Sequence, residues 1–83
     1  MEKSVFTRDY RVLLRLLKDG RREAGLTQVD LAKKLDITQS LLSKIERGGR
    51  RIDVIELRAF CAAFGIGLPE FVRRLERELK GRH

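Results

Sequence analysis

The stretch GLTQVDLAKKLDITQSLLSKIERGGRR, residues 25–51, decides how this chain of 83 residues folds. It contains two short helical patterns, each preceded by a threonine of the kind that caps a helix. Thr27 can cap the first helix, with Asp30 three residues on as its capping-box partner. Thr38 can cap the second, which we expect to span residues 39–47. Two short helices separated by so tight a turn must cross steeply.

The helix at residues 39–47 has two different faces. Successive positions advance by about 100° around a helix, which gathers on one side a set of polar residues: Gln39, Ser40, Ser43, Lys44 and Arg47. The apolar residues Leu41, Leu42 and Ile45 fall opposite, and Glu46 lies on the border. A merely solvated face would normally mix charges of both signs. Amide, hydroxyl and cationic groups without a carboxylate instead suit base edges in a DNA major groove, as in a helix-turn-helix motif.

Helical spacing continues on both sides of this stretch, and strand signals are weak. We expect a first helix over residues 8–24, stopped by Gly25, and a fourth over residues 53–64, capped by Asp53. A fifth begins at about Pro69, which fits the first position of a helix. The fold prediction is all-α: a compact five-helix bundle forming a single domain over residues 1–83, with an N-terminal arm at 1–7 and a C-terminal tail at 81–83.

The charge of the chain indicates a polyanionic partner. There are 19 Lys and Arg residues against 12 Asp and Glu, giving +7 at neutral pH. The excess lies in the first two thirds, because residues 1–26 and 27–51 each carry +3 and the remainder only +1. Such a concentrated positive field favours nucleic acid as partner. The alternative is a solvated surface that serves solubility.

The composition excludes several classes of protein. Cys61 is the only cysteine and His83 the only histidine, so neither an internal disulfide, a zinc site nor a Ser–His or Cys–His catalytic pair can form. We therefore expect that the protein is not an enzyme and that it binds neither a metal nor a cofactor. We expect Cys61 to be a small core residue. No apolar run reaches the roughly 18 residues of a membrane span, and the N-terminus lacks a signal peptide. These observations favour the cytoplasm.

Four short motifs make the sequence similar to a known family. "LTQ" opens the second helix, "LA" lies within it, "TQS" opens the third helix and "SKIERG" closes it. Together they resemble the phage Cro/repressor-like, or XRE, helix-turn-helix family, over about residues 10–75. The resemblance implies a lambda-repressor-like fold and a sequence-specific transcriptional regulator of double-stranded DNA. It further implies an operator bound as a homodimer, with helix 39–47 in the major groove, and association with the nucleoid.

The resemblance also implies roles for individual residues. Gln28 would contact a phosphate and brace Gln39. The base-contacting residues would be Gln39, Ser40 and Lys44, with Ser43 as a weaker candidate. The phosphate-contacting residues would include Thr38, Arg47, Arg50 and Arg51, although for Arg50 and Arg51 solvation or a local salt bridge is the alternative. Arg21 and Glu46 would form an internal salt bridge. One departure is Asp36, which stands where the family usually has glycine and must tolerate a left-handed conformation.

Other functions stay open at this stage. The chain could be an antitoxin or adaptor that binds a partner protein, with or without DNA, through residues 1–9 or the fifth helix. Leu79 could belong to the core or to a dimer contact. Binding of single-stranded RNA is disfavoured, because the polar face lacks aromatic residues on which bases could stack.

Overall fold

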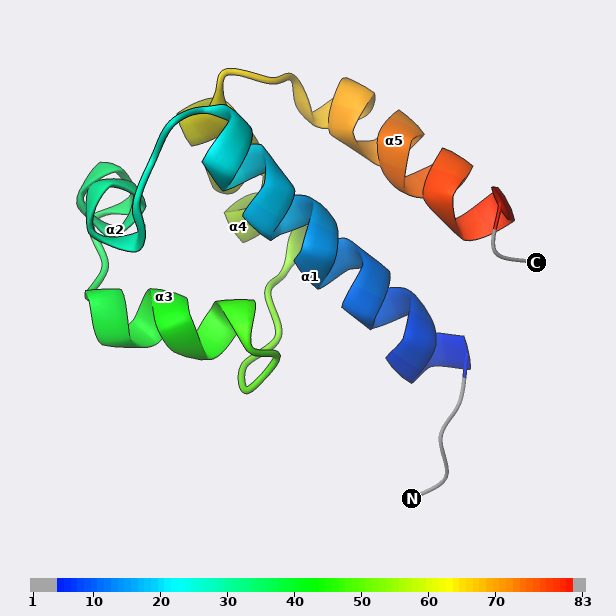
Figure 1. The fold of residues 1–83 in the computed structure, drawn as a ribbon, viewed down its shortest axis with the longest axis horizontal. Coiled ribbons are helices and arrows are strands. Elements are labelled where there is room, and N and C mark those ends of the chain that lie inside the picture. Colours follow the sequence, from blue (N-terminus) through cyan, green and yellow to red (C-terminus); the bar gives the residue numbers. More distant parts are fainter. Residues whose placement is uncertain (1–4, 82–83) are drawn as a thin grey trace.

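The computed structural model describes residues 5–81, and side chains from residue 7 onward. All regular elements in this range are helices: α1 (Val5–Glu23), α2 (Gln28–Leu35), α3 (Gln39–Glu46), α4 (Val54–Phe64) and α5 (Leu68–Gly81). In Figure 1, α1 crosses the molecule diagonally, with α2 and α3 to its left, α5 to its right and α4 partly hidden behind it. The prediction of an all-α fold with five helices is confirmed. No helix within residues 5–81 combines the length and the apolar character that a membrane crossing needs.

One core holds all five helices together. Leu17 of α1, Leu31 of α2, Leu42 of α3 and Cys61 of α4 are almost completely buried, and Phe71 of α5 joins them. The prediction that Cys61 is a small core residue is confirmed, and burial raises the pKa of its thiol. Because each helix contributes a buried side chain, the position of α3 depends on the packing of the whole bundle.

The helix ends form as their sequences predict. The predicted capping box between Thr27 and Asp30 is present, and Asp53 caps α4 as predicted, in a second capping box with Glu56. The backbone N–H of Thr27 bonds to the Asp30 carboxylate, which lowers the pKa of that group. Asp36 adopts the left-handed conformation with φ 58° and ψ 45°, and ends α2. The turn that glycine usually makes is therefore made here by an aspartate.

Some of the predicted helix boundaries are wrong. Helix α1 begins at Val5, so residues 5–7 belong to its first turn rather than to an arm. No proline or glycine interrupts this stretch, which lets the helix continue beyond the first apolar residue of its stripe. Residues 1–4 of the predicted arm and residues 82–83 of the predicted tail lie outside the described residues, and Gly81 belongs to α5.

Gly20 lies in the middle of α1 for a packing reason. A Cβ atom at this position would lie 2.7 Å from the Phe64 ring of α4, closer than two carbon atoms can approach. The absence of a side chain therefore lets the end of α4 pack directly against α1.

Candidate nucleic-acid interface

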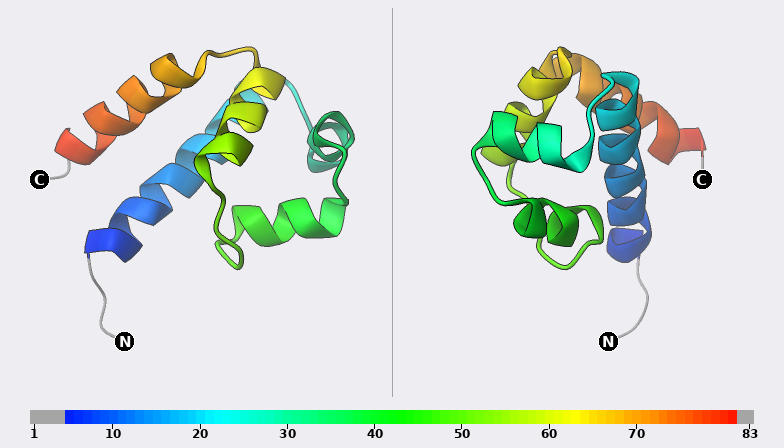
Figure 2. Two further views of the ribbon diagram at one scale, coloured as in Figure 1. Left: turned by 180° about the vertical axis from the view of Figure 1, so that it is seen from behind. Right: turned by 60° about the vertical axis from the view of Figure 1, so that its left-hand side comes forward.

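Helix α3 lies at the edge of the bundle with one side free. Figure 2 shows it at the end of the molecule remote from α5. On its inward side, α3 buries its own residues Leu42, Ile45 and Glu46. The opposite side carries the predicted polar set, of which Gln39, Ser40, Lys44 and Arg47 are exposed and Ser43 is half-buried. The two-faced helix that the sequence predicts is therefore present, with an outward face that has amide, hydroxyl and cationic groups and no carboxylate.

The N-terminus of α3 is fixed by Thr38. Its hydroxyl oxygen accepts the backbone N–H of Leu41 at 3.0 Å and closes the first turn of the helix. The threonine itself is exposed beside Gln39 and Ser40. The side chain thus has a structural role as a cap, and its hydroxyl proton can still be donated to a ligand.

A buried salt bridge joins α1 to the far end of α3. Arg21 Nε lies 2.7 Å from Glu46 Oε2, and a second guanidinium nitrogen lies 3.2 Å from Glu46 Oε1. Arg21 also donates to the carbonyl oxygen of Leu26 at 3.0 Å. This is the pair that the family resemblance implies. Both side chains are nearly inaccessible to solvent. The two hydrogen bonds between guanidinium and carboxylate compensate for the burial of the two charges.

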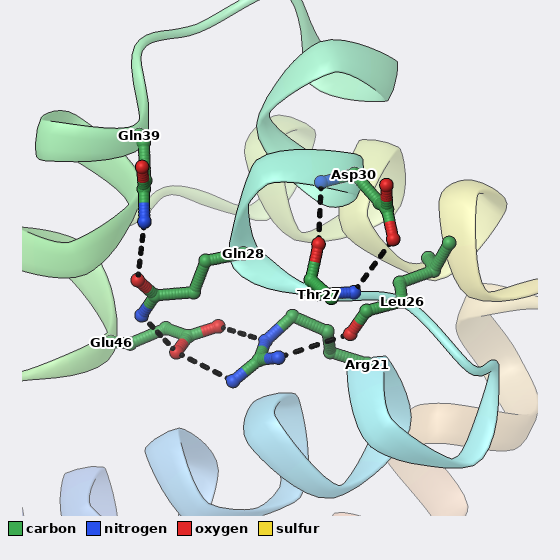
Figure 3. A network of polar contacts seen from close by, with 7 residues as sticks. All are labelled: Arg21, Leu26, Thr27, Gln28, Asp30, Gln39 and Glu46. Atoms are coloured by element: carbon green, nitrogen blue, oxygen red, sulfur yellow. Dashed lines mark hydrogen bonds and ion pairs between the residues drawn. The ribbon is translucent and has the colours of Figure 1, made fainter.

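The network continues from this salt bridge to the exposed end of α3 (Figure 3). Gln28, the first residue of α2, donates from Nε2 to Glu46 Oε1 at 2.9 Å. Its Oε1 lies 3.5 Å from Nε2 of Gln39, at the limit of a hydrogen bond. The structure therefore connects Gln39 on the outward face to a buried ion pair through one amide group.

The three arginines predicted to bind phosphate have different surroundings. Arg47 donates to Ser43 Oγ at 2.7 Å, which keeps it on the outward face of α3. Arg50 instead forms a two-pronged ion pair with Glu56, at 2.6 and 3.3 Å. This bond lowers the pKa of Glu56 and raises that of Arg50. For Arg50, the local salt bridge that the sequence left as the alternative is present.

Arg51 lies over an aromatic ring that the sequence did not single out as functional. Its guanidinium carbon is 4.3 Å from the centre of the Tyr10 ring, a cation–π geometry. The Tyr10 hydroxyl accepts the backbone N–H of Ile52 at 3.2 Å. Tyr10 lies within α1, and helical spacing alone does not distinguish it from a core residue. In the structure it holds the loop after α3 against α1.

Comparison with known proteins finds similarity to helix-turn-helix regulators. A helix-turn-helix family profile matches residues 17–71. The control protein C.MunI of Mycoplasma sp. is 30% identical over 64 residues, spanning 77% of this chain and 86% of that protein. The uncharacterized HTH-type transcriptional regulator y4dJ of Sinorhizobium fredii is 40% identical over 52 residues, spanning 63% and 68% of the two chains.

Solved structures show the same fold. An XRE-family like protein from Pseudomonas syringae pv. tomato superposes with a TM-score of 0.83 at 39% identity, covering 89% of this chain and 90% of the other. The nucleoprotein complex of C.Esp1396I contains a chain that superposes with a TM-score of 0.71 at 29% identity, covering 83% and 88%. The sequence and the fold agree, and the chain belongs to the XRE family of DNA-binding helix-turn-helix transcriptional regulators.

Proposed function

We propose that the protein is a sequence-specific regulator that binds an operator in double-stranded DNA as a homodimer. The observation that carries this proposal is the outward face of α3, which is exposed and has hydrogen-bonding and cationic side chains without a carboxylate. Gln39, Ser40, Ser43 and Lys44 are proposed to read base edges in the major groove. The cytoplasm, at the nucleoid, is the compartment in which this activity belongs.

Around this face, other groups are proposed to hold the DNA backbone. Arg47 and Arg51 are exposed cations at the C-terminal end of α3 and in the following loop. Gln28 and Thr38 lie at the N-terminal ends of α2 and α3, where backbone N–H groups and the helix dipole favour a phosphate. Backbone contacts on both sides of a recognition helix fix its register on the duplex. Arg50 is proposed to contribute little to phosphate binding, because its guanidinium is already bonded to Glu56.

The comparisons support the proposal by similarity. The structure of C.Esp1396I is that of a nucleoprotein complex, and C.MunI is named a control protein. A dimer would place two α3 helices in successive major grooves, so its operator would have two half-sites about 34–36 Å apart.

Selection of bound fragments from a random duplex library tests the proposal directly. We expect the recovered sequences to share a motif of two related half-sites separated by about one helical turn. Sedimentation of the complex should show two protein chains per operator. Recovery of unrelated sequences would contradict base reading, and a single half-site with one bound chain would contradict the homodimer.

A further inference from the structure

A cationic pocket lies beside the polar face of α3, between the first half of α1 and the loop that follows α3. Its volume is about 190 Å³. Since a water molecule occupies about 30 Å³ in the liquid, the pocket has room for a phosphate group with some of its hydration. The residues that line it are Thr7, Tyr10, Arg11, Leu14, Arg47, Gly48 and Arg51.

The charge of this pocket has one sign. Arg11 comes from α1, Arg47 from the end of α3 and Arg51 from the loop, and among the side chains of residues 7–81 no carboxylate lines the space between them. Over residues 5–81, none of the three arginines forms an ion pair with an acidic side chain. Three cations that converge without a counter-charge repel one another, and a bound anion would remove that repulsion.

The larger groove between α1 and α5 has charges of both signs. It has a volume of about 490 Å³, and its lining contains arginines together with Asp19, Glu23 and Glu78. Arg15 is already paired with Glu78 at 2.6 Å across the groove. A groove whose cations are neutralised has little preference for an anion, so the smaller pocket is the stronger candidate.

Contacts within the protein pre-position the donors of the small pocket. Arg51 is stacked on the Tyr10 ring, which leaves the N–H groups at the edge of its guanidinium free to donate. The Tyr10 hydroxyl accepts the Ile52 N–H, and therefore has its own proton available for a ligand. Arg47 is held by Ser43. Donors whose positions are already fixed lose little entropy on binding.

The loop backbone also packs closely against α1 at this place. Gly48 has φ +85°, and a Cβ atom on it would lie 3.0 Å from Leu14 Cδ1. A side chain at this position would combine backbone strain with a steric contact and would push the loop away from α1. The close approach keeps Arg47 and Arg51 within the same pocket as Arg11.

We propose that this pocket binds a backbone phosphate of DNA and that Arg11 and Tyr10 of α1 are part of the DNA-binding surface. The inference rests on the proposed function and extends it to a helix outside the helix-turn-helix. Arg47 both lines the pocket and bonds to Ser43 on the outward face of α3. A duplex seated on α3 therefore brings its sugar-phosphate backbone past the pocket.

The test is the salt dependence of binding to a random-sequence duplex. Arg11 is exposed, so Arg11→Gln should keep the melting temperature of the wild type. The variant should bind every duplex several-fold more weakly, and its slope of log K against log salt should be shallower by about 0.9, the value of one phosphate contact. Arg73→Gln is the matched control, because it removes the same charge from α5, where Arg73 pairs with Glu70. Its slope should equal that of the wild type.

The possible results separate this inference from the proposed function. If Arg11→Gln and Arg73→Gln both keep the wild-type slope while Gln39→Ala loses sequence discrimination, the phosphate pocket is refuted and the proposed function stands. If the wild type binds no duplex, both are refuted.

A second measurement distinguishes free phosphate from the backbone phosphate of DNA as the ligand. Inorganic phosphate can be titrated into the protein while the guanidinium N–H signals of Arg11, Arg47 and Arg51 are followed by NMR. Saturation at low millimolar phosphate, together with an unchanged salt slope in Arg11→Gln, would show that the pocket serves a free phosphate compound and would overturn its assignment to DNA.

Discussion

Gln28 donates its amide N–H to Glu46 Oε1 across 2.9 Å, and this bond fixes which way the amide faces. A carboxylate in a salt bridge can only accept, so the nitrogen of Gln28 must point to Glu46 and its oxygen to Gln39. The Gln39 amide, with Nε2 directed at that oxygen, keeps one N–H and its own oxygen for a ligand. A donor beside an acceptor matches the N7 and N6–H groups of adenine, whereas guanine offers two acceptors.

Replacing Gln28 should therefore weaken the choice of base. Gln28→Met removes the amide while leaving Arg21 and Glu46 paired, and it frees Gln39 to rotate. A good bidentate contact contributes about 1–3 kcal/mol of discrimination between bases. We expect Gln28→Met to reduce this discrimination by about 1 kcal/mol. Binding to the selected operator and to its single-base variants measures the effect.

Gln39→Ala serves as the reference for this experiment, because it removes the amide that we propose reads the base. It should cost about 1–3 kcal/mol of specific binding and relax the base preference at one position of each half-site. An equal loss on all sequences would contradict base reading by Gln39. A guanine at the position that Gln39 contacts, or an undiminished adenine preference in Gln28→Met, would contradict the fixed amide.

Glu46→Gln should destabilise the fold far more than a comparable exposed change. It leaves the buried guanidinium of Arg21 without its counter-charge, which costs about 3–5 kcal/mol in buried pairs. Glu78→Gln breaks an exposed pair with Arg15, for which the expected loss is below about 1 kcal/mol. Urea unfolding gives both free energies. Equal values would show that the buried pair does not stabilise α3 against α1.

The burial of Glu46 shows how far the sequence alone could lead. Angular position around the helix placed it on the border between the polar and apolar faces, which is correct for α3 viewed by itself. Its burial requires Arg21, 25 residues away, to arrive from α1 with a matching guanidinium. The family resemblance implied this partner. The hydrogen bond from Gln28 to Glu46 depends on how α2 and α3 cross, and local periodicity does not predict that crossing.

The loop after α3 was harder to predict than the helices. Arg50 and Arg51 are adjacent in the sequence and have the same charge, so they received the same role. Their different partners follow from the path of the loop, which brings Arg50 to Glu56 and Arg51 to Tyr10. Tyr10 is 42 residues from the Ile52 N–H that it accepts. Contacts of this separation have no signature in helical spacing.

Acid should weaken the loop through Glu56. The Arg50 guanidinium and the Asp53 backbone N–H lower the pKa of Glu56 below its usual 4.5. A carboxyl group whose pKa is lower in the folded state stabilises the fold above its unfolded pKa, and this contribution disappears as the pH falls through the folded value. Glu56→Gln should therefore melt at a lower temperature than the wild type at pH 7, and the difference should shrink below about pH 4.5.

The control for this experiment is Glu76→Gln, an exposed change on α5. Its melting temperature should follow that of the wild type across the same pH range. A constant difference between Glu56→Gln and the wild type from pH 7 to pH 3 would show that ionisation of Glu56 is not coupled to folding.

Arg50 and Arg51 should respond differently to substitution. Arg51→Ala removes an exposed cation stacked on Tyr10, so it should weaken binding to specific and random DNA alike and reduce the salt slope by about 0.9. Arg50→Ala leaves Glu56 without its partner, so it should lower the melting temperature while the salt slope stays near that of the wild type. Binding at several salt concentrations, together with thermal unfolding, separates the two effects. An equal reduction of the salt slope in both variants would show that Arg50 leaves Glu56 and binds phosphate in the complex with DNA.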